Sequence, residues 1–453
     1  MEALKEVVLM NNQTIRPIHY LGSKLRMLES IKDAIDSVDI TQGPVCDLFA
    51  GSGTVSKYMI QYRDVVAVDI QQYSVVLCEA SVNRFQGKES VESVLKEIVG
   101  SETNKLVQQA FRPLLEYENR SMEKAIIKDI SDLYDIIENG SIYITMNRPE
   151  QLSATEELNN CILQSIDNLK RSNLDQSLDT LITRYYGGLY FSYNQAVALD
   201  NIAHIAFKHE GVIKTKILAA LLSTTSEIVN TVGKQFAQPL KVRDSKGEYK
   251  ISLRTKILQD RQLDVYRIFS EWLHYYFQVG EQKHNLITKC ADYYQALQSL
   301  VDTNTKAVYA DPPYTRYHYS RYYHVLETIC LRDNPPVTST FPNGKGGISR
   351  AIYREGRHQS PFCIKTQAED AFRKMINGTA ELHIPLILSY SPFDASKAVT
   401  PRLRTIDQLL EMANSYYKNV DVRSPGAFTH SKLNSTEKNL DSNHEAELLI
   451  VCY

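Results

Sequence analysis

Residues 45–70 contain, in order, a short apolar run, a glycine turn, a helical stretch and a second apolar run, and this order constrains the fold more than any other feature. The first run covers residues 45–49 and leads into Gly51 and Gly53, and the second covers residues 65–70. A strand, a helix and a strand at this spacing form a unit whose two strands are parallel. The segment therefore predicts an α/β fold.

Apolar runs of strand length return in the last third of the chain, at residues 307–310, 384–389 and 447–452. The long stretch before them has helical periodicity instead. A chain of 453 residues is longer than one ordinary small domain and has room for an insertion. Because the strand-like runs lie near the two ends, we expect residues 1–85 and 300–453 to share one sheet. We expect residues 86–299 to form a large, mainly helical insertion.

The composition is that of a globular protein, with 43% hydrophobic and 23% charged residues. No apolar stretch is long enough to span a membrane and the N-terminus has no secretion signal, so we expect a cytoplasmic protein without membrane contact. The seven cysteines lack disulfide or metal-binding spacing, which predicts reduced thiols and no metal site. With a formal net charge of −2, a nucleic-acid surface would need local clusters of basic residues.

The glycine turn after residues 45–49 is a candidate ligand site. Gly51 and Gly53 allow a sharp bend and let a ligand approach main-chain N–H groups at the start of a helix. Asp69 ends the next apolar run, where a carboxylate can accept hydrogen bonds from ribose hydroxyls. The third glycine of the dinucleotide fingerprint is missing, so a structural turn without a ligand is the competing interpretation.

Asp311-Pro312-Pro313-Tyr314 follows the apolar run at residues 307–310. Two consecutive prolines force an extended backbone and have no N–H to donate, which leaves their carbonyl groups free as acceptors. An exocyclic amine stacked on Tyr314 could donate one hydrogen to Asp311 and the other to the carbonyl of Pro312. Both hydrogen bonds would direct the lone pair of the amine towards an electrophilic methyl group.

These two motifs resemble those of the amino-methyltransferases that modify DNA. The earlier segment His19-Tyr20-Leu21-Gly22-Ser23-Lys24 resembles the N-terminal element of the Dam-like adenine methyltransferases, which also have a DPPY motif. In that family the order is the N-terminal element, the loop for S-adenosylmethionine (AdoMet), a target-recognition insertion and then DPPY, as it is here. The resemblance covers roughly residues 15–85 and 300–453, and the insertion is longer than in the compact members of the family.

The resemblance implies a Rossmann-like AdoMet-dependent methyltransferase sheet and a role for each motif residue. The residues expected to bind AdoMet are Tyr20, Gly22, Lys24, Asp47, Phe49, Gly51, Gly53 and Asp69. The first three would surround its methionine end, and Asp69 would hold the ribose. The residues expected to hold the target base are Asp311, Pro312, Pro313 and Tyr314. The base would have to be flipped out of the DNA duplex.

Two basic segments are candidates for DNA contact, one at residues 234–256 and one in the glycine-rich segment after DPPY. Basic side chains there could contact phosphates, and the amides of Asn230 and Gln235 could read base edges. The candidates for phosphate contact are Lys234, Lys241, Arg243, Lys246, Arg350, Arg354 and Arg357. For the first segment, a solvated surface loop is the competing interpretation.

The favoured hypothesis is a site-specific methyltransferase that modifies adenine N6 in double-stranded DNA, with AdoMet as donor and S-adenosyl-L-homocysteine as product. It would work with a cognate restriction endonuclease or other defence-system subunits. Cytosine N4 is the nearest competing target, because that amine presents the same two hydrogens, and aspartate at position 311 favours adenine. Two further hypotheses are an RNA amino-methyltransferase and a catalytically silent DNA-binding specificity protein.

Overall fold

The computed structural model describes residues 16–20, 22, 24–340, 346–392, 402–425 and 447–453. Leu21 and Ser23 of the N-terminal motif lie outside the described residues. In the described part of the chain, no helix has the length and apolar character needed to cross a membrane.

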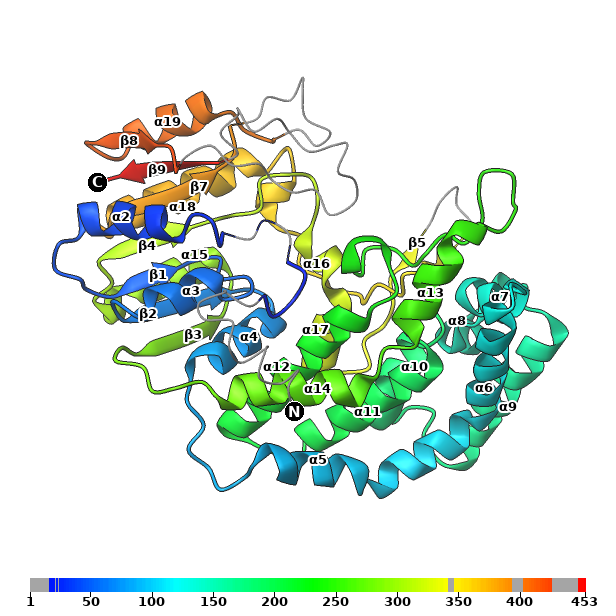
Figure 1. The fold of residues 1–453 in the computed structure, drawn as a ribbon. Helices are drawn as coiled ribbons and strands as arrows, with labels where there is room; N and C mark the ends of the chain where they lie inside the picture. Colours follow the sequence, from blue (N-terminus) through cyan, green and yellow to red (C-terminus); the bar gives the residue numbers. More distant parts are fainter. Residues whose placement is uncertain (1–15, 21, 23, 341–345, 393–401, 426–446) are drawn as a thin grey trace.

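Seven strands form one sheet in the order β3-β2-β1-β4-β7-β9-β8 (Figure 1). Neighbouring strands from β3 to β7 are parallel, and β9 runs antiparallel to both β7 and β8. If the parallel strands alone are counted along the chain, so that β7 is the fifth, their order is the 3-2-1-4-5 of a doubly wound fold. The strands are β1 (Val45–Asp47), β2 (Val65–Asp69), β3 (Leu286–Cys290), β4 (Ala307–Ala310), β7 (Leu386–Tyr390), β8 (Val420–Arg423) and β9 (Leu448–Cys452). The predicted Rossmann-like α/β sheet is confirmed.

Helices cover both faces of the sheet, and alternate strand residues pack against each layer. Val45 and Val65 lie in an apolar cluster with Ile31 of one helix layer. Cys46 and Val66, one residue further on, lie in a cluster with the other layer. Parallel strands buried on both faces need this continuous apolar sequence. The first layer consists of α2 (Leu28–Val38), α3 (Thr54–Met59) and α4 (Gln72–Val82), and the second of α15 (Tyr293–Gln298), α18 (Ala368–Glu381) and α19 (Ile406–Asn414).

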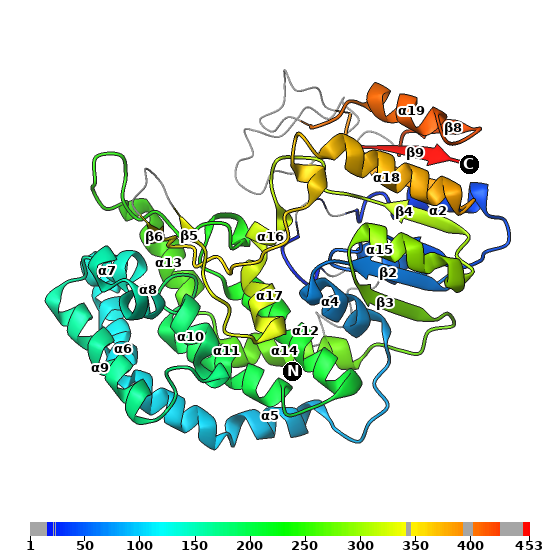
Figure 2. The ribbon, with the colours of Figure 1, turned by 180° about the vertical axis from the view of Figure 1, so that it is seen from behind.

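Ten α-helices lie between α4 and β3 in the sequence and form a helical body beside the sheet (Figures 1 and 2). They are α5 (Val91–Val99), α6 (Glu102–Ile126), α7 (Ser131–Asn139), α8 (Ile142–Asn147), α9 (Glu156–Arg171), α10 (Leu181–Tyr186), α11 (Tyr193–Ala206), α12 (Gly211–Ile228), α13 (Arg254–Arg261) and α14 (Val265–Phe277). The expected limit of this region at residue 299 was too late, because β3 already pairs with β2 along its length. We did not predict β3 from the sequence, because its side chains are only partly buried, as is usual for a strand at the edge of a sheet.

Two short helices after β4 connect the sheet to the helical body. They are α16 (Tyr319–Tyr322) and α17 (His324–Leu331), and both views place them between the two parts (Figures 1 and 2). Val325 and Leu326 of α17 share one apolar cluster with Val76 of α4 and with residues of α12 and α14. The chain then forms the small hairpin of β5 (Ser339–Thr340) and β6 (Gly347–Ile348) before it returns to the sheet.

Candidate active site

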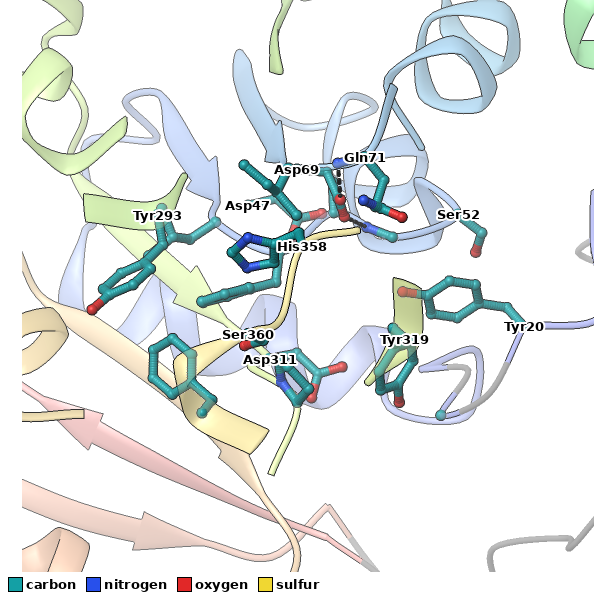
Figure 3. Close-up of a pocket in the computed structure, with 18 of the residues that line it drawn as sticks. Tyr20, Asp47, Ser52, Asp69, Gln71, Tyr293, Asp311, Tyr319, His358 and Ser360 are labelled. Carbon is teal, nitrogen blue, oxygen red and sulfur yellow. Dashed lines mark hydrogen bonds between the residues drawn. The ribbon is translucent and has the colours of Figure 1, made fainter. Parts of the chain in front are cut away.

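The carboxyl ends of β1 and β4 open onto one pocket, at the point where the strand order reverses (Figure 3). Open α/β sheets bind ligands at this switch point. The pocket has a volume of about 1040 Å³, and both Gly51 and Asp311 line it. Of the predicted site residues, Tyr20, Gly22, Lys24, Asp47, Phe49, Gly51, Asp69, Asp311 and Pro313 line the pocket. Three motifs far apart in the sequence therefore meet at one cavity.

The turn after β1 depends on its glycines. Gly51 and Gly53 have positive φ values of 54° and 76°, a conformation that L side chains rarely adopt. A Cβ atom on Gly51 would lie 2.7 Å from the hydroxyl oxygen of Tyr20, so the close contact between the turn and the N-terminal motif also excludes a side chain. A Cβ on Gly53 would lie 3.0 Å from the Cα of Cys78 in α4. Gly53 lies behind the turn and is not among the residues that line the pocket.

Asp69 at the end of β2 holds the glycine turn in place. Its Oδ2 accepts a hydrogen bond from the N–H of Gly51 at 2.9 Å, and its Oδ1 accepts one from the N–H of Gln71 at 2.8 Å (Figure 3). Burial raises the pKa of Asp69 to about 7, although these two N–H groups favour its charged form. Each carboxylate oxygen has a second lone pair, so Asp69 can still accept hydroxyl groups from a ligand.

Asp47 at the end of β1 is a second buried carboxyl group of the pocket. Its Oδ2 accepts a hydrogen bond from Ser56 Oγ at 2.7 Å. Its Oδ1 is buried and has no hydrogen-bond partner among the described residues. Burial raises the pKa of Asp47 to about 6. A buried carboxylate with an unused oxygen favours a cationic or hydrogen-bonding ligand.

Asp311, Lys24 and Glu447 form a chain of charges at the end of β4. The Lys24 ammonium lies 2.6 Å from Asp311 Oδ2 and 2.9 Å from Glu447 Oε1. Glu447 precedes β9 and also accepts a hydrogen bond from Ser389 Oγ at 2.9 Å. The Lys24 and Glu447 side chains are only 5% and 1% exposed, whereas Asp311 is 22% exposed and reaches the pocket. Lys24 thus holds the Asp311 carboxylate in place, and Glu447 in turn holds Lys24.

The charges of this group shift one another's pKa values. Burial raises the pKa of Asp311, the Lys24 ammonium opposes that change, and the negative charge of Glu447 adds to it. Burial alone would lower the pKa of Lys24, but the two carboxylates outweigh it and raise that pKa well above the usual value. The three groups together carry one net negative charge, which stabilises a positive charge in the pocket.

The two prolines and Tyr314 differ in their access to the pocket. Pro313 lines it, whereas Pro312 is buried and Tyr314 is not among the lining residues. The guanidinium of Arg402 lies 4.9 Å from the centre of the Tyr314 ring, and the ring of Tyr390 lies 5.0 Å from it. The N–H of Leu403 donates a hydrogen bond to the Tyr314 carbonyl at 3.3 Å. Arg402 therefore occupies a face of the ring on which the target base was expected to stack.

Several pocket residues were not predicted from the sequence. Glu447 is the first residue of the apolar run at 447–452, and an acidic residue at that position was the available signal. His358 and Ser360 come from a segment that borders the pocket (Figure 3), and Phe362 of the same segment also lines it; the segment has no recognisable motif. Phe362 packs edge to face on Phe49 with ring centres 5.5 Å apart, which makes an apolar wall. Tyr293 of α15 adds to the aromatic lining, as does Tyr319 of α16, which belongs to a tyrosine-rich run that the sequence already suggested as a pocket wall.

Three of the residues predicted to contact DNA are instead held by partners within the protein. Lys234 Nζ lies 2.8 Å from Asp260 Oδ1 and also donates to two main-chain carbonyls. Arg350 donates to the carbonyl of Ile137 at 2.8 Å, and Arg354 lies 2.6 Å from a carboxylate oxygen of Asp333. The expected amide readers Asn230 and Gln235 are buried. Basic residues in a sequence do not show which acids will neutralise them.

The hairpin that carries Lys241, Arg243 and Lys246 is exposed to solvent. Its two strands are bridged between Arg243 and Tyr249, and the Arg243 guanidinium lies 3.9 Å from the centre of the Tyr249 ring. Arg243 also pairs with Glu138 at 2.8 Å. Lys241 and Lys246 form no salt bridge within the described part of the chain. These two lysines are therefore available to an external anion.

Comparison with known proteins agrees with these motifs. The model of the D12 class N6 adenine-specific DNA methyltransferases matches residues 20–185. The chain is 25% identical to the modification methylase LlaI of Lactococcus lactis subsp. lactis over 445 residues, which cover 94% of this chain and 56% of that protein. It is 24% identical to the type II methyltransferase M.FokI of Planomicrobium okeanokoites over 381 residues, 83% of this chain and 44% of that protein.

The chain thus spans about half the length of these curated relatives. No solved structure matches it. The family match begins at Tyr20 and includes the glycine turn and Asp69, and the match to LlaI extends over nearly the whole chain. The chain is therefore similar to the N6 adenine-specific DNA methyltransferases of the D12 class over residues 20–185, and to two modification methylases over most of its length.

Proposed function

We propose that the chain transfers a methyl group from AdoMet to the N6 amine of adenine in double-stranded DNA. The observation that carries this proposal is the shared pocket, since Gly51 at the end of β1 and Asp311 at the end of β4 line the same cavity. The family match and the names of the two relatives support adenine as the base and a modification system as the setting. A cognate restriction endonuclease is the partner that this setting suggests.

The residues on the β1 and β2 side fit AdoMet. Asp47 offers a buried oxygen without a partner, and Asp69 has lone pairs left for ribose hydroxyls. The rings of Phe49, Tyr293 and Phe362 form an apolar wall suited to an adenine ring. The net negative charge of the pocket suits a sulfonium cation. When bound, AdoMet supplies an electrophilic methyl group, and no residue of the chain has to become covalently modified.

The residues on the β4 side orient the amine. Asp311, which lines the pocket, accepts one amine hydrogen and so helps to direct the nitrogen lone pair into the pocket. As the nitrogen gains the methyl group it must lose a proton, and the raised pKa of Asp311 makes its carboxylate a better acceptor for that proton. Lys24 and Glu447 keep the carboxylate in place. Most of the rate enhancement then comes from orientation.

The direct test compares the wild-type chain with Asp311→Ala, using AdoMet labelled in its methyl group and unmodified duplex DNA. We expect transfer to fall by at least about 1000-fold, as for loss of a group that acts in the transition state, while AdoMet binding stays within a few-fold of wild type. Asp370→Ala on the exposed surface of α18 is the matched control. Methylation retained in purified Asp311→Ala would overturn the role of Asp311.

A parallel incubation with RNA tests the substrate class. We expect label in DNA and none in RNA. Label in RNA alone would favour the RNA amino-methyltransferase, and tight DNA binding without any transfer would favour the catalytically silent specificity protein.

A further inference from the structure

Arg321 and Arg357 lie against the same aromatic ring and have no acidic partner. Their guanidinium carbons are 5.1 and 4.6 Å from the centre of the Tyr353 ring. Arg321 Nε donates a hydrogen bond to the Tyr353 hydroxyl at 2.7 Å, and Arg357 Nε donates to the carbonyl of Arg354 at 3.2 Å. Neither arginine forms a salt bridge with any residue that the structure describes. Two positive charges are thus held against one ring without a carboxylate partner among the described residues.

Two other arginines that stack on tyrosines have carboxylate partners, whereas Arg184 over Tyr185 donates instead to Asn334 Oδ1 at 2.6 Å and to the Ser177 carbonyl at 2.9 Å. Arg120 lies over Tyr117 and pairs with Glu157 at 3.0 Å. Arg243 lies over Tyr249 and pairs with Glu138. The missing carboxylate therefore distinguishes Arg321 and Arg357 from these two stacked arginines. Like charges at short range repel, and an external anion between them would remove that cost.

Two histidines extend this basic cluster. Burial lowers the pKa of His318, and the positive charges of Arg357, His358 and Arg321 lower it further. The Nδ1 atom of His318 is buried and has no hydrogen-bond partner among the described residues. Burial lowers the pKa of His358, and the carboxylate of Asp292 opposes that change while it accepts the N–H of Tyr294 at the start of α15. The cluster of Arg321, Arg357, His318 and His358 thus contains several donors for an anion. Glu327 lines the same hollow as Arg357, and its two oxygens accept the N–H groups of Gln72 and Tyr73.

The cluster lies at the edge of the active-site pocket. Ser320, next to Arg321, and His358, next to Arg357, both line that pocket, and Ser320 Oγ donates a hydrogen bond to the His358 carbonyl. Arg357 also lines a second hollow that shares Ser320 and His358 with the main pocket. An anion held by the two arginines would therefore lie beside any base that enters the main pocket.

We propose that Arg321 and Arg357 bind the backbone phosphate next to the flipped target base. This inference rests on the proposed function, because it takes the pocket to receive a base from DNA. A flipped base stays attached to its sugar and phosphates, so a phosphate must come to rest near the pocket edge. Guanidinium groups hold phosphates through paired N–H donors. The stacked Tyr353 ring limits the motion of both side chains before DNA arrives.

The test first maps the modified site by sequencing the DNA of a host that expresses the wild-type chain. Duplexes with this site are then made with a single neutral methylphosphonate at each phosphate flanking the target base. Binding is measured with S-adenosyl-L-homocysteine present. We expect the wild type to lose about 10-fold or more in affinity at one of these positions, as for loss of a charge-assisted hydrogen bond.

The double variant Arg321→Gln/Arg357→Gln should bind the unmodified duplex about as weakly as the wild type binds the methylphosphonate duplex. The double variant should bind the methylphosphonate duplex no more weakly than it binds the unmodified one. Arg120→Gln, a stacked arginine on α6, is the matched control and should retain the wild-type response. Arg321→Lys/Arg357→Lys keeps both charges and should recover part of the affinity.

The methylphosphonate could instead reduce the affinity of the double variant by the same factor as that of the wild type. That phosphate would then be bound by other residues, and the proposal would be overturned. Wild-type binding that no methylphosphonate weakens would also overturn it. A lower melting temperature with an unchanged methylphosphonate response would show that the arginines only support Tyr353. Failure of the proposed function is distinguishable, because the wild type would then transfer no methyl group to DNA at all.

Discussion

The two sides of the pocket hold their carboxylates in different ways. Asp69 is fixed by main-chain N–H groups of Gly51, in the turn after β1, and of Gln71, in the turn after β2. Asp311 is fixed by a lysine ammonium that it shares with Glu447, and these three residues come from the two ends of the chain and from β4. The first arrangement stabilises a binding turn, whereas the second controls the position and charge of one reacting group. Substitutions on the two sides should therefore affect different steps.

Asp69→Asn should reduce AdoMet binding, and its effect should be larger than that of substituting Glu447 on the other side of the pocket. Asparagine has one carbonyl oxygen, so one of the two N–H groups loses its acceptor and the turn loosens. We expect AdoMet affinity to fall by about 10-fold to 100-fold, with little change in transfer rate at saturating AdoMet.

Isothermal titration calorimetry and rate measurements at saturating AdoMet separate the two effects. Asp264→Asn is the matched control, because Asp264 also accepts two main-chain N–H groups, from Tyr266 at 2.9 Å and Arg267 at 3.1 Å. A lower rate with unchanged AdoMet affinity would contradict the assignment of Asp69 to the donor side.

Glu447→Gln should act on the reaction step and leave AdoMet binding nearly unchanged. The negative charge of Glu447 raises the pKa of Asp311, so its removal lowers that pKa. The active carboxylate then persists to lower pH, and the acidic limb of the rate profile should move to lower pH. We expect kcat to fall about tenfold, as for loss of a positioning contact.

Ser389→Ala removes a smaller contact of Glu447 and should produce a smaller change. If Glu447→Gln lowers the rate without moving the acidic limb, Glu447 has only a structural role.

The donor side should also show a pH dependence of its own. Burial raises the pKa of Asp47 to about 6 and that of Asp69 to about 7, so both carboxyl groups bind protons well above the usual range. A cationic ligand favours their charged forms, and AdoMet should bind more tightly as pH rises from about 5 to 8, by up to about tenfold per pH unit for each proton displaced. Titrations in buffers of different ionisation enthalpy should detect proton release. Affinity that does not change with pH would contradict this prediction.

The exposed hairpin should have the smallest effect on transfer and a visible effect on salt dependence. Replacing Lys241, Arg243 and Lys246 by glutamine should reduce the slope of log affinity against log salt by up to about 3. The same change at Lys105, Arg112 and Lys124 on α6 is the control. An unchanged slope would remove the hairpin from the DNA surface.

The same contrast explains how much could be predicted from the sequence. The glycine turn, Asp69 and DPPY are local patterns at strand ends, and parallel strands bring their carboxyl ends to one edge of the sheet. Glu447 could not be assigned, because its role depends on pairing between distant strands. The ion pair between Lys234 and Asp260 could not be foreseen, because it depends on how distant segments pack. The edge strand β3 was missed because its side chains are only partly buried.

The most direct test of the central claim identifies the product. Duplex DNA lacking modified bases is incubated with the purified chain and AdoMet, digested to nucleosides and analysed by mass spectrometry. We predict N6-methyl-2′-deoxyadenosine in the wild-type reaction and none with Asp311→Ala. N4-methyl-2′-deoxycytidine as the sole product would contradict adenine as the target, and no methylated nucleoside from a chain that binds both AdoMet and DNA would contradict the account of the pocket.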